Sequence, residues 1–403
     1  MRTLPRLKTT RSRFVVARLL IMIAIGSLAA GSALAQDDPT SKLKNNWPSY
    51  RNGFQLLGVS NDELPEKLEV LWSIPTEFGV ASTAAIVADR VYIPTLGGDV
   101  LCVELRTGKI LWKTRSIDDP DPAAFAPGFK SSPTVWEGVV YLGDEDGLFH
   151  AFDAQTGKRK WQFKTNGEIV SSASIVGEKV IFGSYDNNLY CLNRKTGEKI
   201  WSFETDGYVN CSPAISKEHT FVTGCDEHLR VINLETGEEE IDMPLGSYLI
   251  ASPALRDGIL YVGTYASSVL AIDWKTKETL WSYRDENKEF PYHSSAAVTE
   301  EMVIIGGRDK QIHAIDRKTG RGVWTFATRG RVDSCPVVLG ERVFCGASDG
   351  FLYELNTKTG QELNRYKIGR EVTASPAIGQ NCLVIAAEGS NEPIVCLGKK
   401  TKS

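Results

Sequence analysis

The chain has 403 residues, of which 42% are hydrophobic, with 46 basic and 50 acidic side chains and a formal net charge of −4. Six of the basic residues and none of the acidic ones lie within residues 1–35, so the remainder has 40 basic and 50 acidic side chains and a net charge of −10. Because nonspecific binding to nucleic acid depends on clustered Lys and Arg, this balance argues against a nucleic-acid partner.

The first 35 residues have the pattern of a signal peptide of the general secretory type, which is set aside when the fold is considered. A basic segment from Arg2 to Arg18 precedes an apolar run from Leu19 to Ala30, and Ala33 to Ala35 form a small-residue cleavage site. The apolar run is shorter than the roughly 20 residues of a membrane span. We therefore expect cleavage after Ala35, no transmembrane span after cleavage, and a periplasmic or secreted product. No cysteine precedes Cys102, so the leader contains no lipobox.

A Thr-Gly-x-x-x-Trp motif recurs along the rest of the chain with a period of about 40 residues, which indicates one supersecondary unit repeated. Its Gly and Trp members, including those of incomplete copies, are Trp72, Gly108, Trp112, Gly157, Trp161, Gly197, Trp201, Trp281, Gly320 and Trp324. Each unit contains four short β-branched or alternating runs, separated by turn clusters rich in Gly, Asp and Asn. With no helical window between units, this pattern predicts a four-stranded propeller blade, whose strands we name A to D from the channel outward.

Eight units can be counted from the expected beginnings of the A strands. These lie near Ala81, Ser131, Ser171, Cys211, Ala251, Ser294, Ser334 and Ala374. The last unit lacks its D strand, but an unused strand from Leu68 to Ile74 can supply it, which closes the ring and removes both sheet edges. The expected fold is all-β, an eight-bladed propeller of four-stranded antiparallel blades. Its domains are a signal peptide (1–35), a lead-in (36–67) and the propeller (68–403).

The segment from Ala151 to Trp161 resembles the tryptophan-docking motif of pyrroloquinoline-quinone (PQQ) repeat propellers, in which each indole lies over the glycine turn of the next blade. The Ser-Ser-Pro starts of the A strands are similar to that family too, and the resemblance covers residues 68–397. The lead-in from Trp47 to Gly53 resembles the opening of exported bacterial propellers of this kind. In length and blade number the chain looks most like BamB-type outer-membrane assembly proteins, although it lacks their lipobox. Quinoprotein alcohol dehydrogenases share the motif but are much longer.

Candidate ligand residues lie where D–A connections and B–C turns converge around the channel. The residues directly before the A strands are Val80, Lys130, Val170, Asn210, Ile250, His293, Asp333 and Thr373. Lys130, Asn210 and His293 could hold a small anionic or polar ligand, with Asp333 as the orienting group or base. The alternative is that these are solvated residues at the channel mouth.

An acidic, proline-rich insertion at residues 118–127 is either a partner-binding arm or a tolerated surface loop.

Cysteine and histidine positions give little sign of bridges or metals. Cys102, Cys191 and Cys396 occupy a C-strand position that holds alanine in other blades, so they are predicted to be small buried fillers. The pairs Cys211 with Cys225, Cys335 with Cys345 and Cys382 with Cys396 could face each other within one blade or remain free thiols. The five histidines show no ligand spacing, and neither a Cys-x-x-Cys motif nor a vicinal cysteine pair occurs. We predict neither a catalytic residue nor a metal site.

Three functions remain open from the sequence. The favoured one is a non-enzymatic, monomeric scaffold that docks a protein or cell-envelope partner on its loop face. The first alternative, implied by the family resemblance, is a small quinoprotein that oxidises an alcohol or sugar with PQQ and calcium at the channel mouth. The second is a polysaccharide-binding propeller, with Trp136, Tyr208, Tyr248 and Tyr292 as platforms.

Overall fold

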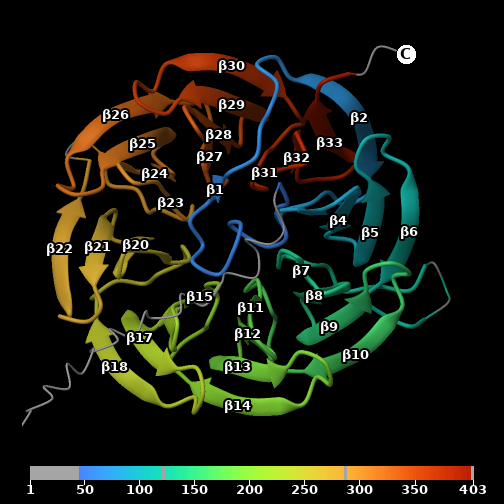
Figure 1. Ribbon diagram of the computed structural model, residues 1–403, viewed down its shortest axis with the longest axis horizontal. Coiled ribbons are helices and arrows are strands. Elements are labelled where there is room, and N and C mark those ends of the chain that lie inside the picture. Colours follow the sequence, from blue (N-terminus) through green and yellow to red (C-terminus); the bar gives the residue numbers. More distant parts are fainter. Residues whose placement is uncertain (1–44, 120, 122, 286–287, 401–403) are drawn as a thin grey trace, which may run out of the picture. The chain divides into compact units, whose positions relative to one another are not determined.

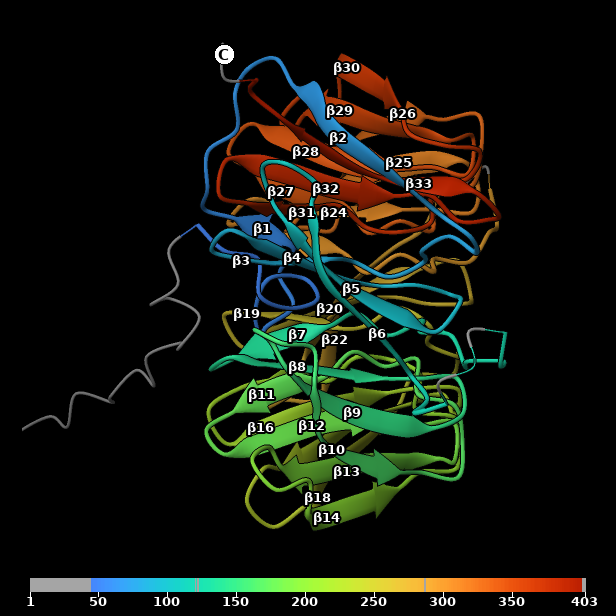
Figure 2. The ribbon, with the colours of Figure 1, turned by 90° about the vertical axis from the view of Figure 1, so that its right-hand side faces the viewer.

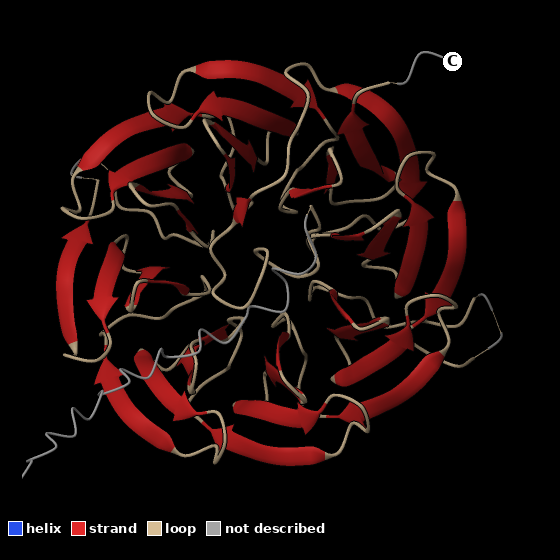
Figure 3. Ribbon diagram, in the orientation of Figure 1, coloured by secondary structure: helices blue, strands red, loops and turns tan. Residues whose placement is uncertain are grey.

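The described part of the chain is a ring of eight antiparallel sheets around a central channel (Figures 1 and 3). The computed structural model describes residues 45–400 except 120, 122, 286 and 287, so the predicted signal peptide and residues 36–44 of the lead-in lie outside the described residues. The predicted fold class and blade number are confirmed. None of the described segments forms a helix of the length and hydrophobicity that a membrane span requires.

Each blade has a short A strand at the channel and a D strand at the outer surface. Blades one to four comprise β3 (Ala85–Val87), β4 (Arg90–Pro94), β5 (Asp99–Glu104), β6 (Ile110–Arg115); β7 (Thr134–Trp136), β8 (Val139–Gly143), β9 (Leu148–Asp153), β10 (Arg159–Lys164); β11 (Ser174–Val176), β12 (Lys179–Gly183), β13 (Asn188–Asn193), β14 (Lys199–Glu204); and β15 (Ala214–Ile215), β16 (His219–Thr223), β17 (His228–Asn233), β18 (Glu239–Pro244). Blades five to seven comprise β19 (Ala254–Arg256), β20 (Ile259–Gly263), β21 (Val269–Asp273), β22 (Glu278–Tyr283); β23 (Ala297–Val298), β24 (Met302–Gly306), β25 (Gln311–Asp316), β26 (Gly322–Ala327); and β27 (Val337–Leu339), β28 (Arg342–Gly346), β29 (Phe351–Asn356), β30 (Glu362–Lys367).

The last blade combines both ends of the described chain. It contains β31 (Ala377–Gly379), β32 (Cys382–Ala386) and β33 (Glu392–Gly398), and β2 (Glu69–Thr76) completes it as the D strand. Strand β2 pairs antiparallel with β33 from Glu69 opposite Gly398 to Thr76 opposite Glu392. The predicted closure by an N-terminal strand is therefore confirmed, and it gives β33 a partner on both sides.

Tryptophan docking joins neighbouring blades as the repeat motif predicts. The indole Nε1 of Trp72 donates to the carbonyl oxygen of Leu105 at 2.7 Å, and Trp161 repeats the bond with Arg194 at 3.1 Å. Each ring lies on the glycine of the next turn, so that a Cβ added at Gly197 would come 2.6 Å from Trp161. That glycine has a φ of 77°, a conformation that side chains with a Cβ rarely adopt. Close approach and backbone conformation therefore both require glycine.

Two of the eight blade interfaces lack the contact between tryptophan and glycine, and at both of them the two residues are missing together. The fourth blade has Ile241 in place of tryptophan, and the fifth has Lys277, at a φ of 61°, in place of the turn glycine. The seventh blade has Asn364, and the last blade ends without the following turn. Where the tryptophan is absent, the next blade therefore no longer requires glycine in its turn.

The described lead-in fills one end of the channel, an arrangement that the sequence analysis did not predict (Figure 2). Its strand β1 (Val59–Ser60) adds to β27 in parallel as a fifth strand of the seventh blade. Residues 45–58 also form backbone hydrogen bonds of 2.7–3.0 Å with the A strand, or the turn after it, of seven of the eight blades. The partner residues are Gln380, Ile86, Val135, Ile215, Leu255, Val298 and Val338. We refer to residues 45–62 as the plug.

We predict that Gly197→Ala destabilises the propeller by about 2–4 kcal/mol, because it combines a left-handed conformation with displacement of the Trp161 indole. Gly258→Ala is the matched control, since Gly258 has a φ of 80° but no atom within 4 Å of an added Cβ. The control should cost about 1–2 kcal/mol. Urea unfolding followed by tryptophan fluorescence measures both values, and equal costs would show that docking contributes nothing at this interface.

Candidate binding site in the central channel

A cavity of about 230 Å³ occupies the channel above the plug. Seven of the eight predicted ring residues line it, namely Lys130, Val170, Asn210, Ile250, His293, Asp333 and Thr373. The eighth prediction, Val80, is wrong by one residue. The register of Ala85 with Tyr92 corresponds to that of Thr134 with Tyr141, which aligns Ala81 with Lys130. Val80 is buried beneath the ring, whereas Ala81 lines the cavity.

A second ring of residues lines the cavity, each two positions after a residue of the first ring. Its role was not predicted from the sequence. It consists of Thr83, Ser132, Ser172, Ser212, Ser252, Ser295, Cys335 and Ser375, all of which line the cavity. Along this ring each backbone N–H donates to the side-chain oxygen or sulfur of the next blade, at 2.8–3.1 Å, in seven of the eight interfaces. The signal was present in the sequence as the second serine of the Ser-Ser-Pro starts. We call this set the hydroxyl ring.

The plug supplies the floor of the cavity. The hydroxyl of Tyr50 donates to Ser295 Oγ at 3.0 Å and lies 3.3 Å from Cys335 Sγ. Beside it Arg51, 1% exposed, donates to the carbonyl oxygens of Ala296 and Pro336 at 2.6 Å each. Its guanidinium thereby bridges the sixth and seventh blades, and among the described residues no carboxylate forms an ion pair with it.

The cavity floor changes the ionisation of the Cys335 thiol. Burial pushes the pKa of Cys335 upward, but the Arg51 guanidinium and hydrogen bonds with Tyr50 and Ser375 outweigh burial and hold the pKa below its usual value. By contrast, burial raises the pKa of Cys211 to about 12. Cys335 is therefore the thiol of the channel that ionises most readily.

The charged groups at the rim are already paired with one another. Lys130 Nζ lies 2.8 Å from both Glu145 and Glu168. Burial lowers the pKa of Lys130, but these two carboxylates more than offset that effect and raise it. On the opposite side Asp333 is bound by Arg308 and Arg331, each at 2.9 Å. Asp333 thus forms part of an ion-pair network and is not a free base.

Three of the uncharged polar residues that line the cavity have side chains with few or no strong hydrogen bonds to the protein. Burial lowers the pKa of His293, with the nearby Arg308 as a further cause, so this ring is neutral at pH 7. Neither His293 Nε2 nor Ser82 Oγ has a hydrogen-bond partner within the described structure. Asn210 forms only weak contacts, with the sulfurs of Cys225 at 3.7 Å and Cys211 at 3.4 Å. The structure therefore brings the four predicted site residues to one cavity. Lys130 and Asp333 form ion pairs there, and Asn210 and His293 are uncharged.

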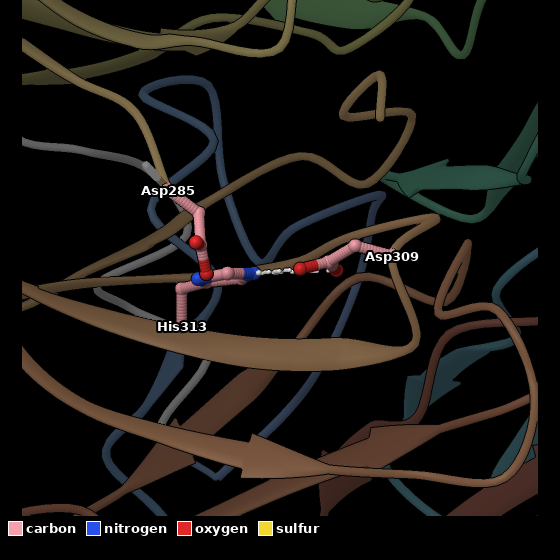
Figure 4. A group of neighbouring side chains, drawn as sticks. All are labelled: Asp285, Asp309 and His313. Carbon is pink, nitrogen blue, oxygen red and sulfur yellow. Dashed lines mark hydrogen bonds and ion pairs between the residues drawn. The ribbon is translucent and has the colours of Figure 1, made fainter. Parts of the chain in front are cut away.

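A separate group of Asp285, Asp309 and His313 has potential ligand atoms within 4.8 Å of one another (Figure 4). Sequence spacing did not reveal it, although His313 follows Asp309 by four residues across a B–C turn. Both ring nitrogens of His313 are engaged, because Nε2 lies 3.1 Å from Asp309 and Nδ1 lies 3.1 Å from the Tyr283 hydroxyl. Burial pushes the pKa of Asp309 up, but the hydrogen bond with His313 holds it below its usual value.

The contact between Asp309 and His313 is one example of a side-chain hydrogen bond that recurs between strand C and the B–C turn. Tyr190 donates to Asp186 at 2.7 Å and Tyr353 to Asp349 at 2.6 Å from the same strand position. In the second blade, His150 contacts Asp144 at 2.8 Å in that position. Because tyrosine serves the same purpose in two blades, we assign these histidines to the structure of the turn.

The loop face carries the exposed aromatic side chains. Phe78, Phe125, Tyr208, Tyr248, Tyr265 and Phe290 are 50–83% exposed, and all lie in D–A or B–C connections. Of the four aromatic platforms proposed for a polysaccharide, Tyr208 and Tyr248 belong to this set. The other two predictions are wrong, because Trp136 is 9% and Tyr292 3% exposed.

The predicted insertion at 118–127 projects from this face, opposite the plug (Figure 2). Its described residues are held at both ends. Arg115 donates to the carbonyl oxygens of Asp121, at 2.7 Å, and Ala124, while Asp118 pairs with Arg159. These bonds present Phe125, which is 83% exposed.

All eight cysteines are free thiols in the structure. The C-strand positions of Cys102, Cys191 and Cys396 are confirmed as fully buried. The three pairs that could have faced each other are not bridged. The described fold is therefore held by packing and hydrogen bonds within and between blades.

The closed ring of eight blades and the indole-on-glycine contacts define a propeller of the PQQ-repeat class. Comparison with protein families agrees over most of the described chain, at residues 68–204, 167–240 and 291–392. The chain belongs to the family of PQQ-like propellers described as outer membrane protein assembly factor BamB. Residues 231–339 also match the family described as glucose/ethanol/alcohol dehydrogenase, beta-propeller domain.

Similar curated proteins come from both groups. The chain is 28% identical over 177 residues to the quinohemoprotein alcohol dehydrogenase ADH-IIG of Pseudomonas putida, covering 39% of this chain and 25% of that protein. It is 27% identical over 112 residues to the outer membrane protein assembly factor BamB of Xanthomonas campestris, covering 26% of this chain and 28% of that protein. The matched segments thus span only about a quarter of either relative.

Solved structures show the same fold. BamB from Moraxella catarrhalis superposes with a TM-score of 0.68 and 21% identity, covering 84% of this chain and 99% of that one. The quinohemoprotein alcohol dehydrogenase ADHIIG of Pseudomonas putida HK5 superposes with a TM-score of 0.75 and 15% identity, covering 90% and 82%. At these identities the likeness establishes the fold alone.

We predict that iodoacetamide alkylates Cys335 before Cys225 at neutral pH. Cys225 is the more exposed thiol, but burial raises its pKa, whereas the pKa of Cys335 is lowered. The pH at which the Cys335 rate is half-maximal should lie below that of an ordinary, unperturbed thiol. Mass spectrometry of peptides after timed alkylation measures both rates.

The variants Arg51→Met and Tyr50→Phe should slow alkylation of Cys335 and leave Cys225 unchanged. Tyr50→Phe keeps the aromatic side chain in the cavity floor. This variant therefore still tests the prediction if Arg51→Met lowers the melting temperature. Faster alkylation of Cys225 in the unsubstituted protein would show that exposure and not thiol ionisation decides reactivity.

Proposed function

We propose that the protein is a non-enzymatic scaffold that docks another protein on its loop face. The observation that carries this proposal is the distribution of exposed aromatic residues. All six lie in the loop connections, where five of them come from D–A segments between different blades. Aromatic side chains of this kind are typical anchors of protein interfaces, and a rigid ring fixes their relative positions.

Charge defines the chemistry of the partner. The side chains of Asp206 and Glu289, which contact Arg230 and Arg284, are still 92% and 81% exposed beside these aromatics, and the insertion adds Asp119 and Asp121. A surface of aromatic anchors among carboxylates complements apolar side chains flanked by Lys and Arg. The partner we propose is therefore a folded protein domain with such a surface. The family description and the similarity to BamB are consistent with a role in envelope assembly.

The quinoprotein alternative is weakened by the chemistry of the channel. PQQ carries three carboxylates, but Lys130, Arg308 and Arg331 are each already bound to acidic side chains. Calcium takes six to eight oxygen ligands, usually including carboxylates. Asp333 is the one carboxylate among the described lining residues, and two arginines bind it. These residues do not fit PQQ with calcium.

The compartment forms part of the same proposal. The basic and apolar leader supports export by the general secretory route, with cleavage after Ala35. A periplasmic or secreted monomer would present its loop face to other envelope proteins.

We predict that a photo-crosslinking residue, p-benzoylphenylalanine, in place of Phe125 gives a discrete crosslinked product in the native cell. Ile200, on the outer strand β14 and 45% exposed, is the control position. The product is identified by mass spectrometry, and binding is then measured with the two purified proteins. Phe125→Ser should weaken that binding about 30-fold, the effect of removing an interface anchor, with no change in melting temperature.

Ile200→Ser should leave the affinity unchanged. Crosslinking of equal yield at both positions, or at neither, would contradict docking on the loop face. Saturable binding of PQQ in calcium with dye-linked alcohol oxidation would instead establish the dehydrogenase.

A further inference from the structure

The cavity above the plug combines a closed floor with an unusually regular set of hydrogen-bond donors. In the hydroxyl ring the oxygens of Ser132, Ser172 and Ser212 each accept a backbone N–H from the preceding blade. A hydroxyl that accepts one bond still has its own hydrogen to donate. None of these three hydrogens has an acceptor among the described protein groups, so they are available to a molecule in the cavity.

Two buried groups of the cavity also lack a partner. Ser82 is 5% exposed and lines the cavity, but its Oγ makes no hydrogen bond within the described structure. The same holds for Nε2 of His293 at the rim. Buried polar atoms are normally satisfied, and such exceptions indicate a missing partner. The residues that carry these two atoms line one cavity, in the first and sixth blades, and the atoms themselves are buried in its wall.

Charge excludes an ionic ligand of either sign. The rim cations Lys130 and Arg308 are held by Glu145, Glu168 and Asp333. An anion would have to displace these carboxylates, and a cation would meet a carboxylate already bound by two arginines. The groups that remain are hydroxyls, the Asn210 amide and a neutral imidazole. They can both donate and accept without a net charge.

Apolar surfaces alternate with these polar groups. Val170 and Ile250 line the cavity between polar rim residues. Tyr185 also lines it, and its ring is stacked on Tyr208 with centroids 4.8 Å apart and an interplanar angle of 5°. The volume of about 230 Å³ is below the roughly 300–1,000 Å³ of sites for drug-sized ligands. A molecule with polar edges, apolar faces and about the size of one sugar ring matches this cavity.

We propose that the cavity is a binding site for an uncharged polyhydroxylated ligand of monosaccharide size. The hydroxyl ring and Tyr50 bind it from below, Asn210 and His293 bind it at the rim, and Tyr185 covers one apolar face. The ligand is either a free sugar or the terminal ring of a glycan. This proposal is independent of protein docking, because it uses no residue of the insertion at 118–127.

The test is saturation-transfer NMR of the purified protein with D-glucose, maltotetraose, inorganic phosphate and oxalate, each titrated to high millimolar concentration. We expect saturable glucose binding with a Kd of about 1 mM, in keeping with a small ligand held by a few hydrogen bonds. Binding of maltotetraose at least as tight as glucose identifies a glycan end, whereas its exclusion identifies a free sugar. Saturable binding of phosphate or oxalate without glucose would overturn the proposal, as would the lack of any saturable binding of either sugar.

A matched pair of variants places the ligand. Ile250→Trp fills the rim without removing a hydrogen-bonding side chain and should weaken sugar binding at least tenfold. Ile200→Trp adds the same ring on the outer strand and should have no effect. If Ile250→Trp lowers the melting temperature, protection of Cys335 from iodoacetamide by glucose in the unsubstituted protein locates the site. Equal binding by both variants together with an unprotected Cys335 would show that the sugar binds elsewhere.

Discussion

The structure depends on the contact between a tryptophan of one blade and the glycine turn of the next. A blade of four short strands buries too little apolar surface to be stable alone, so each requires a neighbour on both sides. The indole provides a large apolar face and one N–H donor, and the next turn provides a carbonyl oxygen and a site without a Cβ. Because both partners are fixed by short-range sequence, the blades pack at the same spacing around the ring.

A second constraint acts at the centre, where short A strands leave a channel that the blades cannot fill. The plug covers one end by backbone hydrogen bonds to seven blades, and Arg51 joins two of them through their carbonyl oxygens. The hydroxyl ring then satisfies the backbone N–H groups above the plug. The cavity is thus a consequence of the way in which the ring is sealed, and its polarity follows from the need to satisfy exposed backbone.

Much of the ring could be predicted from the sequence because the information repeats. The period located all eight blades, the tryptophan contacts and the strand that closes the last blade, and it placed seven residues of the rim. Val80 was misplaced by one residue because the first blade is separated from the second by the insertion, which breaks the spacing. The plug was not predicted, since its sequence has no repeat. Partners such as Arg51 and Pro336 are separated by 285 positions. Ion pairs such as that of Asp333 with Arg308 also depend on which loops meet, so the charge state of the rim could not be inferred from residue types alone.

The closure of the ring by β2 has a further consequence for the order of folding. The plug and β2 are among the first segments of the described chain to be synthesised, yet their partners extend to Gly398, close to its end. Neither segment can reach its final place until the last blade exists, so a nascent or translocating chain must keep residues 45–76 unpaired while the blades accumulate. Such distant pairing slows folding, since loop-closure entropy is lost before the contacts are gained. Until that late step, the partly formed ring presents the unpaired edge of β33 and the uncovered faces of its two terminal blades to chaperones and proteases.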